Sequence, residues 1–101
     1  NLMDEPYTKV KKIVIKPGQA PSYQYHFKRS EIWVVVQGIG KCKIDDEVTT
    51  HEAGDVIYIL KEQKHQFTNV GKSDLIFVEI QLGDYFGEDD IVRLEDKYGR
   101  V

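Results

Sequence analysis

The chain has 101 residues, with 14 Lys and Arg against 17 Asp and Glu, so its formal net charge is −3. This balance argues against nucleic-acid binding, which needs clustered basic side chains. No apolar run approaches the roughly 20 residues that cross a bilayer, and no charged-then-apolar start resembles a signal peptide. Cys42 is the single cysteine, which excludes an intramolecular disulfide and fits a reducing cytoplasm. We expect residues 1–101 to form one cytoplasmic domain, and the start at Asn1 suggests a piece of a longer chain.

Short apolar bursts, broken by turn residues such as Pro17-Gly18, Gly38 and Gly54, predict β-strands along most of the chain. The predicted strands are 10–16, 22–26, 31–37, 41–45, 48–51, 56–60, 65–69 and 75–82. Many short strands at even spacing indicate a sandwich or a barrel.

The last segment, 83–101, is acidic and has no β periodicity. Acidic residues favour the start of a helix, and a helix over 90–98 would place Ile91, Leu94 and Tyr98 on one face. The sequence therefore predicts a short C-terminal helix after the strands.

Four potential metal ligands lie near the predicted strand ends: Gln24, His26, Glu31 and His65. Gln24 and His26 share a face of one strand because strand side chains alternate. One amide oxygen, one carboxylate and two imidazoles suit Zn²⁺, Mn²⁺, Co²⁺, Ni²⁺ or Fe²⁺. The residue types alone favour scattered surface or hydrogen-bonded side chains over a metal site.

The spacing of these residues along the chain favours the metal site over scattered side chains. The order Gly18, five residues, Gln24, one residue, His26, four residues, Glu31, six residues, Gly38 resembles the first cupin motif, with Gln24 at the place of a first His. The order Gly54, ten residues, His65, three residues, Asn69 resembles the second motif, although Leu60 and Glu62 stand where a Pro and a Gly are usual. The resemblance implies an all-β cupin, a double-stranded β-helix or jelly-roll barrel, with one divalent metal ion bound by the four ligands.

Two longer segments, 24–36 and 83–100, resemble the C-terminal domain of type II mannose-6-phosphate isomerases. These domains often follow a mannose-1-phosphate guanylyltransferase domain, and the resemblance covers about 10–100. It implies a metal-dependent isomerase that interconverts mannose 6-phosphate and fructose 6-phosphate. The chain departs from the family at Phe27, Lys28 and Ile32, where further His residues are common.

The isomerisation needs a positioned base, since a proton moves between C2 and C1. Glu79 faces the pocket if Val78 and Ile80 face outward, but Leu75 and Phe77 share its parity and allow the opposite orientation. His65 is a second candidate for the base.

The substrate phosphate needs cations. Arg93 is the first candidate because it lies in the family-like tail and can grip phosphate with two donors. Lys28, Arg29 and Lys64 flank the ligands and are further candidates for phosphate binding, although surface Lys and Arg are usually solvated. Trp33 and Tyr58 are expected in the core rather than as sugar-stacking rings.

Two other functions compete with the isomerase. A cupin without catalysis could bind a sugar or a sugar nucleotide, and the missing His residues favour this alternative. A metal-dependent oxygenase is opposed by the amide ligand and the tail. We also expect a homodimer, formed through outer sheet faces or through an edge strand at 10–15.

Overall fold

The computed structural model describes residues 2–5, 7–83, 86 and 90–95, which form ten β-strands. The strands are β1 (Met3–Asp4), β2 (Thr8–Ile15), β3 (Tyr23–His26), β4 (Arg29–Gln37), β5 (Ile39–Ile44), β6 (Glu47–Glu52), β7 (Val56–Ile59), β8 (His65–Asn69), β9 (Leu75–Gly83) and β10 (Ile91–Glu95). Among the described residues, no helix is long and apolar enough to cross a membrane.

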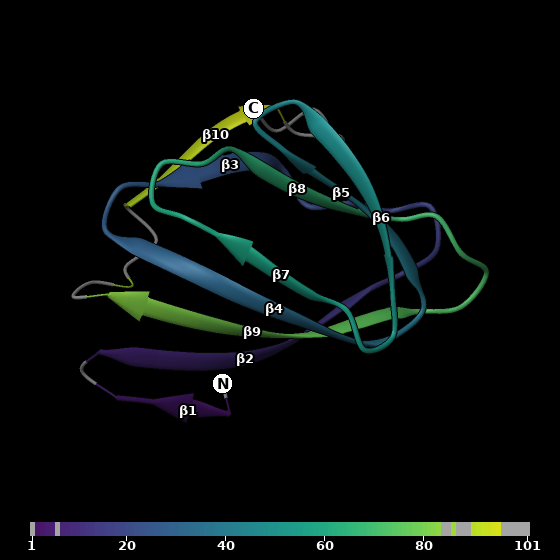
Figure 1. Ribbon diagram of the computed structural model, residues 1–101, viewed down its shortest axis with the longest axis horizontal. Helices are drawn as coiled ribbons and strands as arrows, with labels where there is room; N and C mark the ends of the chain where they lie inside the picture. Colours follow the sequence, from purple (N-terminus) through teal and green to yellow (C-terminus); the bar gives the residue numbers. More distant parts are fainter. Residues whose placement is uncertain (1, 6, 84–85, 87–89, 96–101) are drawn as a thin grey trace.

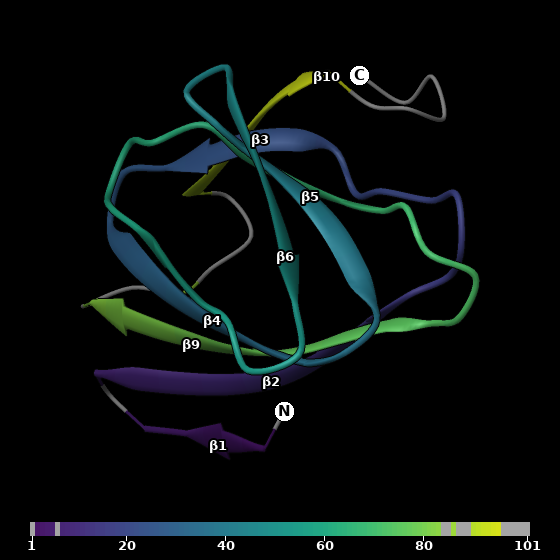
Figure 2. The same cartoon turned by 45° about the vertical axis from the view of Figure 1, so that its right-hand side comes forward.

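The strands form two antiparallel sheets of five strands that face each other as a barrel (Figure 1). The first sheet has the order β1-β2-β9-β4-β7, and the second has the order β10-β3-β8-β5-β6. Turning the molecule shows β1 at the outer margin of the first sheet, beside β2 (Figure 2). The expected all-β barrel is therefore present.

All eight predicted strands are found, with ends within two residues of the expected ones. The strand β1 was not predicted. The predicted C-terminal helix is wrong over the described residues, because Ile91–Glu95 is strand β10 and pairs with β3, with Ile91 opposite His26. Hydrogen bonding along β3 outweighs a weak helical periodicity in so short a segment. The rest of the predicted helix, 96–98, lies outside the described residues.

The core lies between the sheets and is centred on three aromatic rings. The Trp33 ring stacks on Phe67 with centroids 5.4 Å apart, and Phe77 contacts both rings at 4.9 and 5.1 Å. Trp33 is buried as expected, but the expectation for Tyr58 is wrong, since its side chain is 66% exposed. Tyr58 occupies an even position on β7, and even positions of this strand face away from the core.

Two glycines of the cupin-like spacing lie in turns whose backbone conformation is unfavourable for other residues. Gly38 and Gly54 have φ angles of +93° and +95°. A Cβ on Gly38 would also lie 2.8 Å from the Asp74 carbonyl oxygen. These turns join consecutive strands of the barrel, which explains the glycines in the motif spacing.

The core makes a direct prediction about stability. Leu75 is fully buried, so Leu75→Ala is expected to lower the free energy of unfolding by about 2–5 kcal/mol. Leu2→Ala is the matched control, because Leu2 is 64% exposed and its truncation should change the value by less than about 0.5 kcal/mol. Urea denaturation followed by circular dichroism measures both, and equal effects would contradict the described core.

Candidate metal centre

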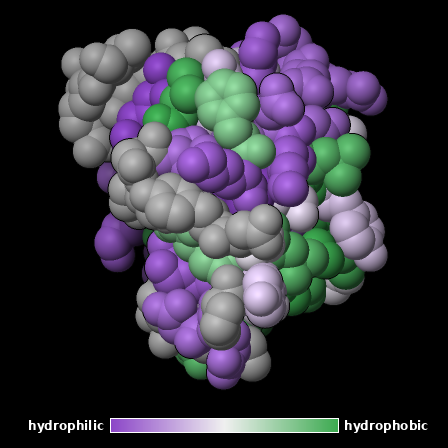
Figure 3. Space-filling view, turned by 90° about the vertical axis from the view of Figure 1, so that its left-hand side faces the viewer, coloured by the Kyte–Doolittle hydropathy of each residue, from purple (hydrophilic) through white to green (hydrophobic). Residues whose placement is uncertain are grey.

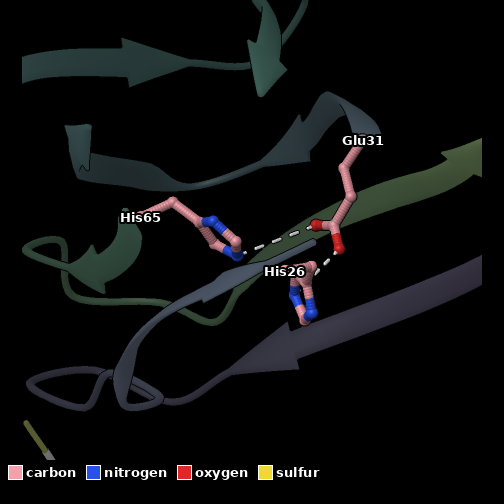
Figure 4. A group of neighbouring side chains, drawn as sticks. All are labelled: His26, Glu31 and His65. Atoms are coloured by element: carbon pink, nitrogen blue, oxygen red, sulfur yellow. Dashed lines mark ion pairs between the residues drawn. The ribbon is translucent and has the colours of Figure 1, made fainter. Parts of the chain in front are cut away.

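Three of the four predicted ligands form a buried cluster. The Glu31 carboxylate faces both imidazoles (Figure 4), with its Oε2 3.4 Å from His26 Nε2 and its Oε1 4.0 Å from His65 Nε2. One potential ligand atom from each of the three residues lies within 4.8 Å of the others. The sequence spacing thus brings together residues from β3, β4 and β8.

Strand pairing positions the fourth predicted ligand. Gln24 lies opposite His65 in the pairing of β3 with β8, and opposite Arg93 in the pairing of β10 with β3. Its side chain lines the cavity beside Glu31 and His65. An amide oxygen is thus available next to the buried cluster.

Glu31 has two further partners that the sequence did not predict. Arg29 Nε donates to Glu31 Oε2 at 2.8 Å, and Trp33 Nε1 donates to Glu31 Oε1 at 2.9 Å. All three residues lie on β4 with the same parity, so their side chains project to the same side. The solvated alternative for Arg29 is wrong, because its side chain is buried against Glu31. Its predicted role as a phosphate ligand stays a prediction, and the residue does line the cavity.

Asp90 holds the turn that follows His26. Its Oδ1 accepts a hydrogen bond from the Phe27 amide at 3.2 Å, and its Oδ2 accepts one from the Lys28 amide at 2.9 Å. The acidic run at 88–90 was the available signal for this role, but the sequence analysis assigned it to a helix start. The buried carboxylate instead joins the turn between β3 and β4 to the start of β10.

The two imidazoles are held in the neutral form. Burial, together with the nearby Arg29 guanidinium, lowers the pKa of His26 to about 3. Burial also lowers the pKa of His65 from its ordinary value. Neutral imidazole is the form that binds metals, so both rings are ready to act as ligands at neutral pH.

A cavity of about 290 Å³ opens beside the cluster. Its charged lining consists of Lys11, Arg29, Glu31, Glu79 and Arg93, and the remainder includes Gln24, Trp33 and His65. Figure 3 views the end of the barrel where β3 and β9 terminate, and hydrophilic side chains gather there. Lys28 and Lys64 are exposed and do not line the cavity.

Glu79 points into the cavity, which resolves the two orientations that the sequence left open. Its neighbours Val78 and Ile80 lie on the opposite face of the sheet, and Gln81 Nε2 donates a hydrogen bond to Glu79 Oε2. Burial, with a smaller contribution from the Glu31 charge, raises the pKa of Glu79 to about 7. A carboxyl group of this kind exchanges protons readily near neutral pH.

The buried cluster fits a divalent cation. Ligand atoms 2.0–2.2 Å from one cation lie roughly 3–4.4 Å apart. The 3.4 and 4.0 Å separations fall in this range at the two different oxygens of Glu31, and the 4.8 Å spread of the three residues requires the side chains to draw slightly closer around a cation. Mixed nitrogen and oxygen donors suit first-row divalent metals.

Comparison with known proteins identifies the family of the domain. Residues 2–96 match the family described as mannose-6-phosphate isomerase C-terminal. The chain belongs to this family. It is 45% identical over 91 residues to a mannose-1-phosphate guanylyltransferase of Salmonella montevideo, and 44% identical over 92 residues to the alginate biosynthesis protein AlgA of Pseudomonas aeruginosa. These matches cover 90% and 91% of this chain but 19% of each relative.

Solved structures confirm the cupin fold. A Klebsiella pneumoniae protein with a double-stranded β-helix domain matches with a TM-score of 0.82 and 23% identity, covering 93% of this chain and 75% of that chain. A putative sugar phosphate isomerase from Acidithiobacillus ferrooxidans matches with a TM-score of 0.70 and 22% identity, covering 75% and 50%. At these identities the likeness shows the fold alone.

The Asp90 contacts yield a testable prediction. Asp90→Ala removes two charge-assisted hydrogen bonds and is expected to lower the free energy of unfolding by about 1.5–3 kcal/mol. Hydrogen exchange at the Phe27 and Lys28 amides should accelerate, as measured by NMR. Asp4→Ala serves as the control because Asp4 is exposed. Unchanged exchange at both amides would contradict the proposed role of Asp90 in holding the turn.

Proposed function

We propose that this domain is a metal-dependent aldose–ketose isomerase that interconverts mannose 6-phosphate and fructose 6-phosphate. The observation that carries the proposal is the juxtaposition of a two-imidazole, one-carboxylate cluster with a cavity that also contains Glu79 and Arg93. Membership of the mannose-6-phosphate isomerase C-terminal family supports the same substrate class.

Gln24, His26, Glu31 and His65 would hold one divalent cation. When bound there, the cation would act as a Lewis acid and stabilise negative charge that develops on the substrate oxygens. The contribution of the chain is to keep both imidazoles neutral and to hold Glu31 in place through Trp33, which donates to Oε1. This contact orients the carboxylate before the substrate arrives.

Glu79 is the candidate base for proton transfer. Its carboxylate would remove the proton on C2 of the aldose and return it to C1, while the hydroxyl proton on O2 moves to O1, so that C2 becomes the carbonyl carbon. Its position on the cavity wall supports this role, as does the hydrogen bond from Gln81 that orients it. His65 is better suited to metal binding, since it contributes to the Glu31 cluster.

Arg93 is the candidate for the substrate phosphate. It lines the cavity and lies opposite Gln24 on the neighbouring strand, so it stands beside the metal ligands. Lys28 and Lys64 lie on the turns that flank His26 and His65, outside the cavity lining. They can contact a phosphate that extends from the cavity, but they form no part of its wall.

The family departures do not alter the cavity wall. Ile32 lies on the outer face of the first sheet, since it pairs with Ile80 and Tyr58 while Glu31 and Trp33 face inward. Phe27 and Lys28 are exposed and are also absent from the lining. The loss of His at these positions therefore removes no group from the site, and catalysis remains better supported than sugar binding alone.

An isomerase assay tests the proposal. Fructose 6-phosphate should form from mannose 6-phosphate, disappear after chelation, and reappear when a divalent metal is restored. Glu79→Gln should lower kcat by at least about 100-fold, in the range expected for general base catalysis. Glu62→Gln, at an exposed turn residue, should leave kcat unchanged. If the domain binds the sugar phosphate but shows no turnover with any added divalent metal, the isomerase proposal is contradicted and the non-catalytic alternative is supported.

Metal content tests the ligand set separately. His65→Ala and Gln24→Ala should each lower the affinity for added Zn²⁺ by at least about tenfold. His51→Ala is the matched control. His51 lies on β6, at the edge of the second sheet, and it contacts Thr49 and Asp55 instead of the cluster. Inductively coupled plasma mass spectrometry after dialysis gives the metal per chain. Full metal content in both ligand variants would contradict the assignment.

A further inference from the structure

Arg29 contacts the two atoms through which His26 and Glu31 would bind a metal ion. Its Nε donates to Glu31 Oε2 at 2.8 Å, and its Nη2 lies 3.1 Å from His26 Nε2. The side chain is buried, and it also forms part of the cavity wall. The Arg29 guanidinium therefore contacts the ligand atoms of His26 and Glu31 and also borders the cavity.

The contact with Nη2 excludes simultaneous metal binding at His26 Nε2. A neutral imidazole nitrogen that accepts a hydrogen bond uses its single lone pair, and the same lone pair is needed to bind a metal. A divalent cation and a guanidinium on the same buried carboxylate would also repel each other strongly at short range. Metal bound at His26 Nε2 therefore requires that Nη2 of Arg29 leave this atom.

We propose that Arg29 is an exchangeable internal cation, which a metal ion displaces from His26 and Glu31 into the cavity. This inference rests on the proposed metal site. The cavity is the open volume beside Arg29, and it already contains Lys11 and Arg93. A displaced guanidinium would add a third positive charge where an anionic substrate binds. Metal and a phosphorylated sugar would then strengthen each other's binding, as linkage requires.

Replacement of Arg29 tests the exchange through metal affinity rather than activity. Zn²⁺ must break two guanidinium contacts in the wild-type chain, whereas Arg29→Met has none to break. Zn²⁺ affinity, measured by competition with a chromophoric chelator, should therefore rise by about tenfold or more in the variant. Lys11→Met is the matched control, since Lys11 lines the cavity without a hydrogen bond or ion pair to either ligand among the described contacts, and it should change the affinity by less than about threefold.

The wild-type chain supplies a second readout that does not depend on the variant's folding. The Nε–H of Arg29 donates to a buried carboxylate, so its NMR signal should exchange slowly with solvent after chelation. Addition of Zn²⁺ should shift this signal and accelerate its exchange at least tenfold.

Two results separate this inference from the metal site itself. Equal Zn²⁺ affinities in wild type and Arg29→Met, or an Nε–H signal that Zn²⁺ leaves unchanged, would overturn the exchange and leave the metal site intact. Failure of both proteins to bind Zn²⁺, with the fold retained, would overturn the metal site and the proposed function together.

Discussion

The carboxylate of Glu31 is the group on which the whole site depends. It is buried, with an exposed fraction of 2%, and it accepts hydrogen bonds from Arg29 and Trp33 while lying within 3.4 and 4.0 Å of two imidazoles. A buried carboxylate needs such partners because an isolated charge is costly inside a protein. The requirement links the core, through Trp33, to the cavity, through Arg29. The same carboxylate thus contributes to folding and to the proposed chemistry.

The barrel converts short sequence spacings into this geometry. His26 ends β3, Glu31 lies near the start of β4, and His65 begins β8, so the three side chains meet at one end of the barrel. Asp90 ties the intervening turn to β10, which flanks β3 on its other side. Strand alternation then directs the ligands inward and leaves residues of the opposite parity, such as Ile32 and Tyr58, on the outside of the first sheet.

The sequence predicted what depends on spacing and parity. The motif glycines and the ligand order identified the barrel, the cluster and Gln24 beside it, since these features depend on a few residues at fixed separations. Tertiary contacts explain what it missed. Arg29 is buried because Glu31 needs a counter-charge, and Asp90 is buried because two turn amides need an acceptor. The helix expected in the tail was wrong because β3 offers a strand-pairing edge that local periodicity does not reveal. Glu62, which stands where the cupin motif usually has Gly, adopts a φ of +66°, in the left-handed region that glycine favours.

X-ray absorption spectroscopy of the protein loaded with one equivalent of Zn²⁺ tests the central claim most directly. The account predicts a nitrogen and oxygen environment at about 2.0–2.2 Å, with the scattering pattern of two imidazole rings and no sulfur. The same spectrum should lose one imidazole in His65→Ala. A site with no imidazole, or with the Cys42 sulfur as a ligand, would contradict the assignment of Glu31 and its neighbours as the metal centre.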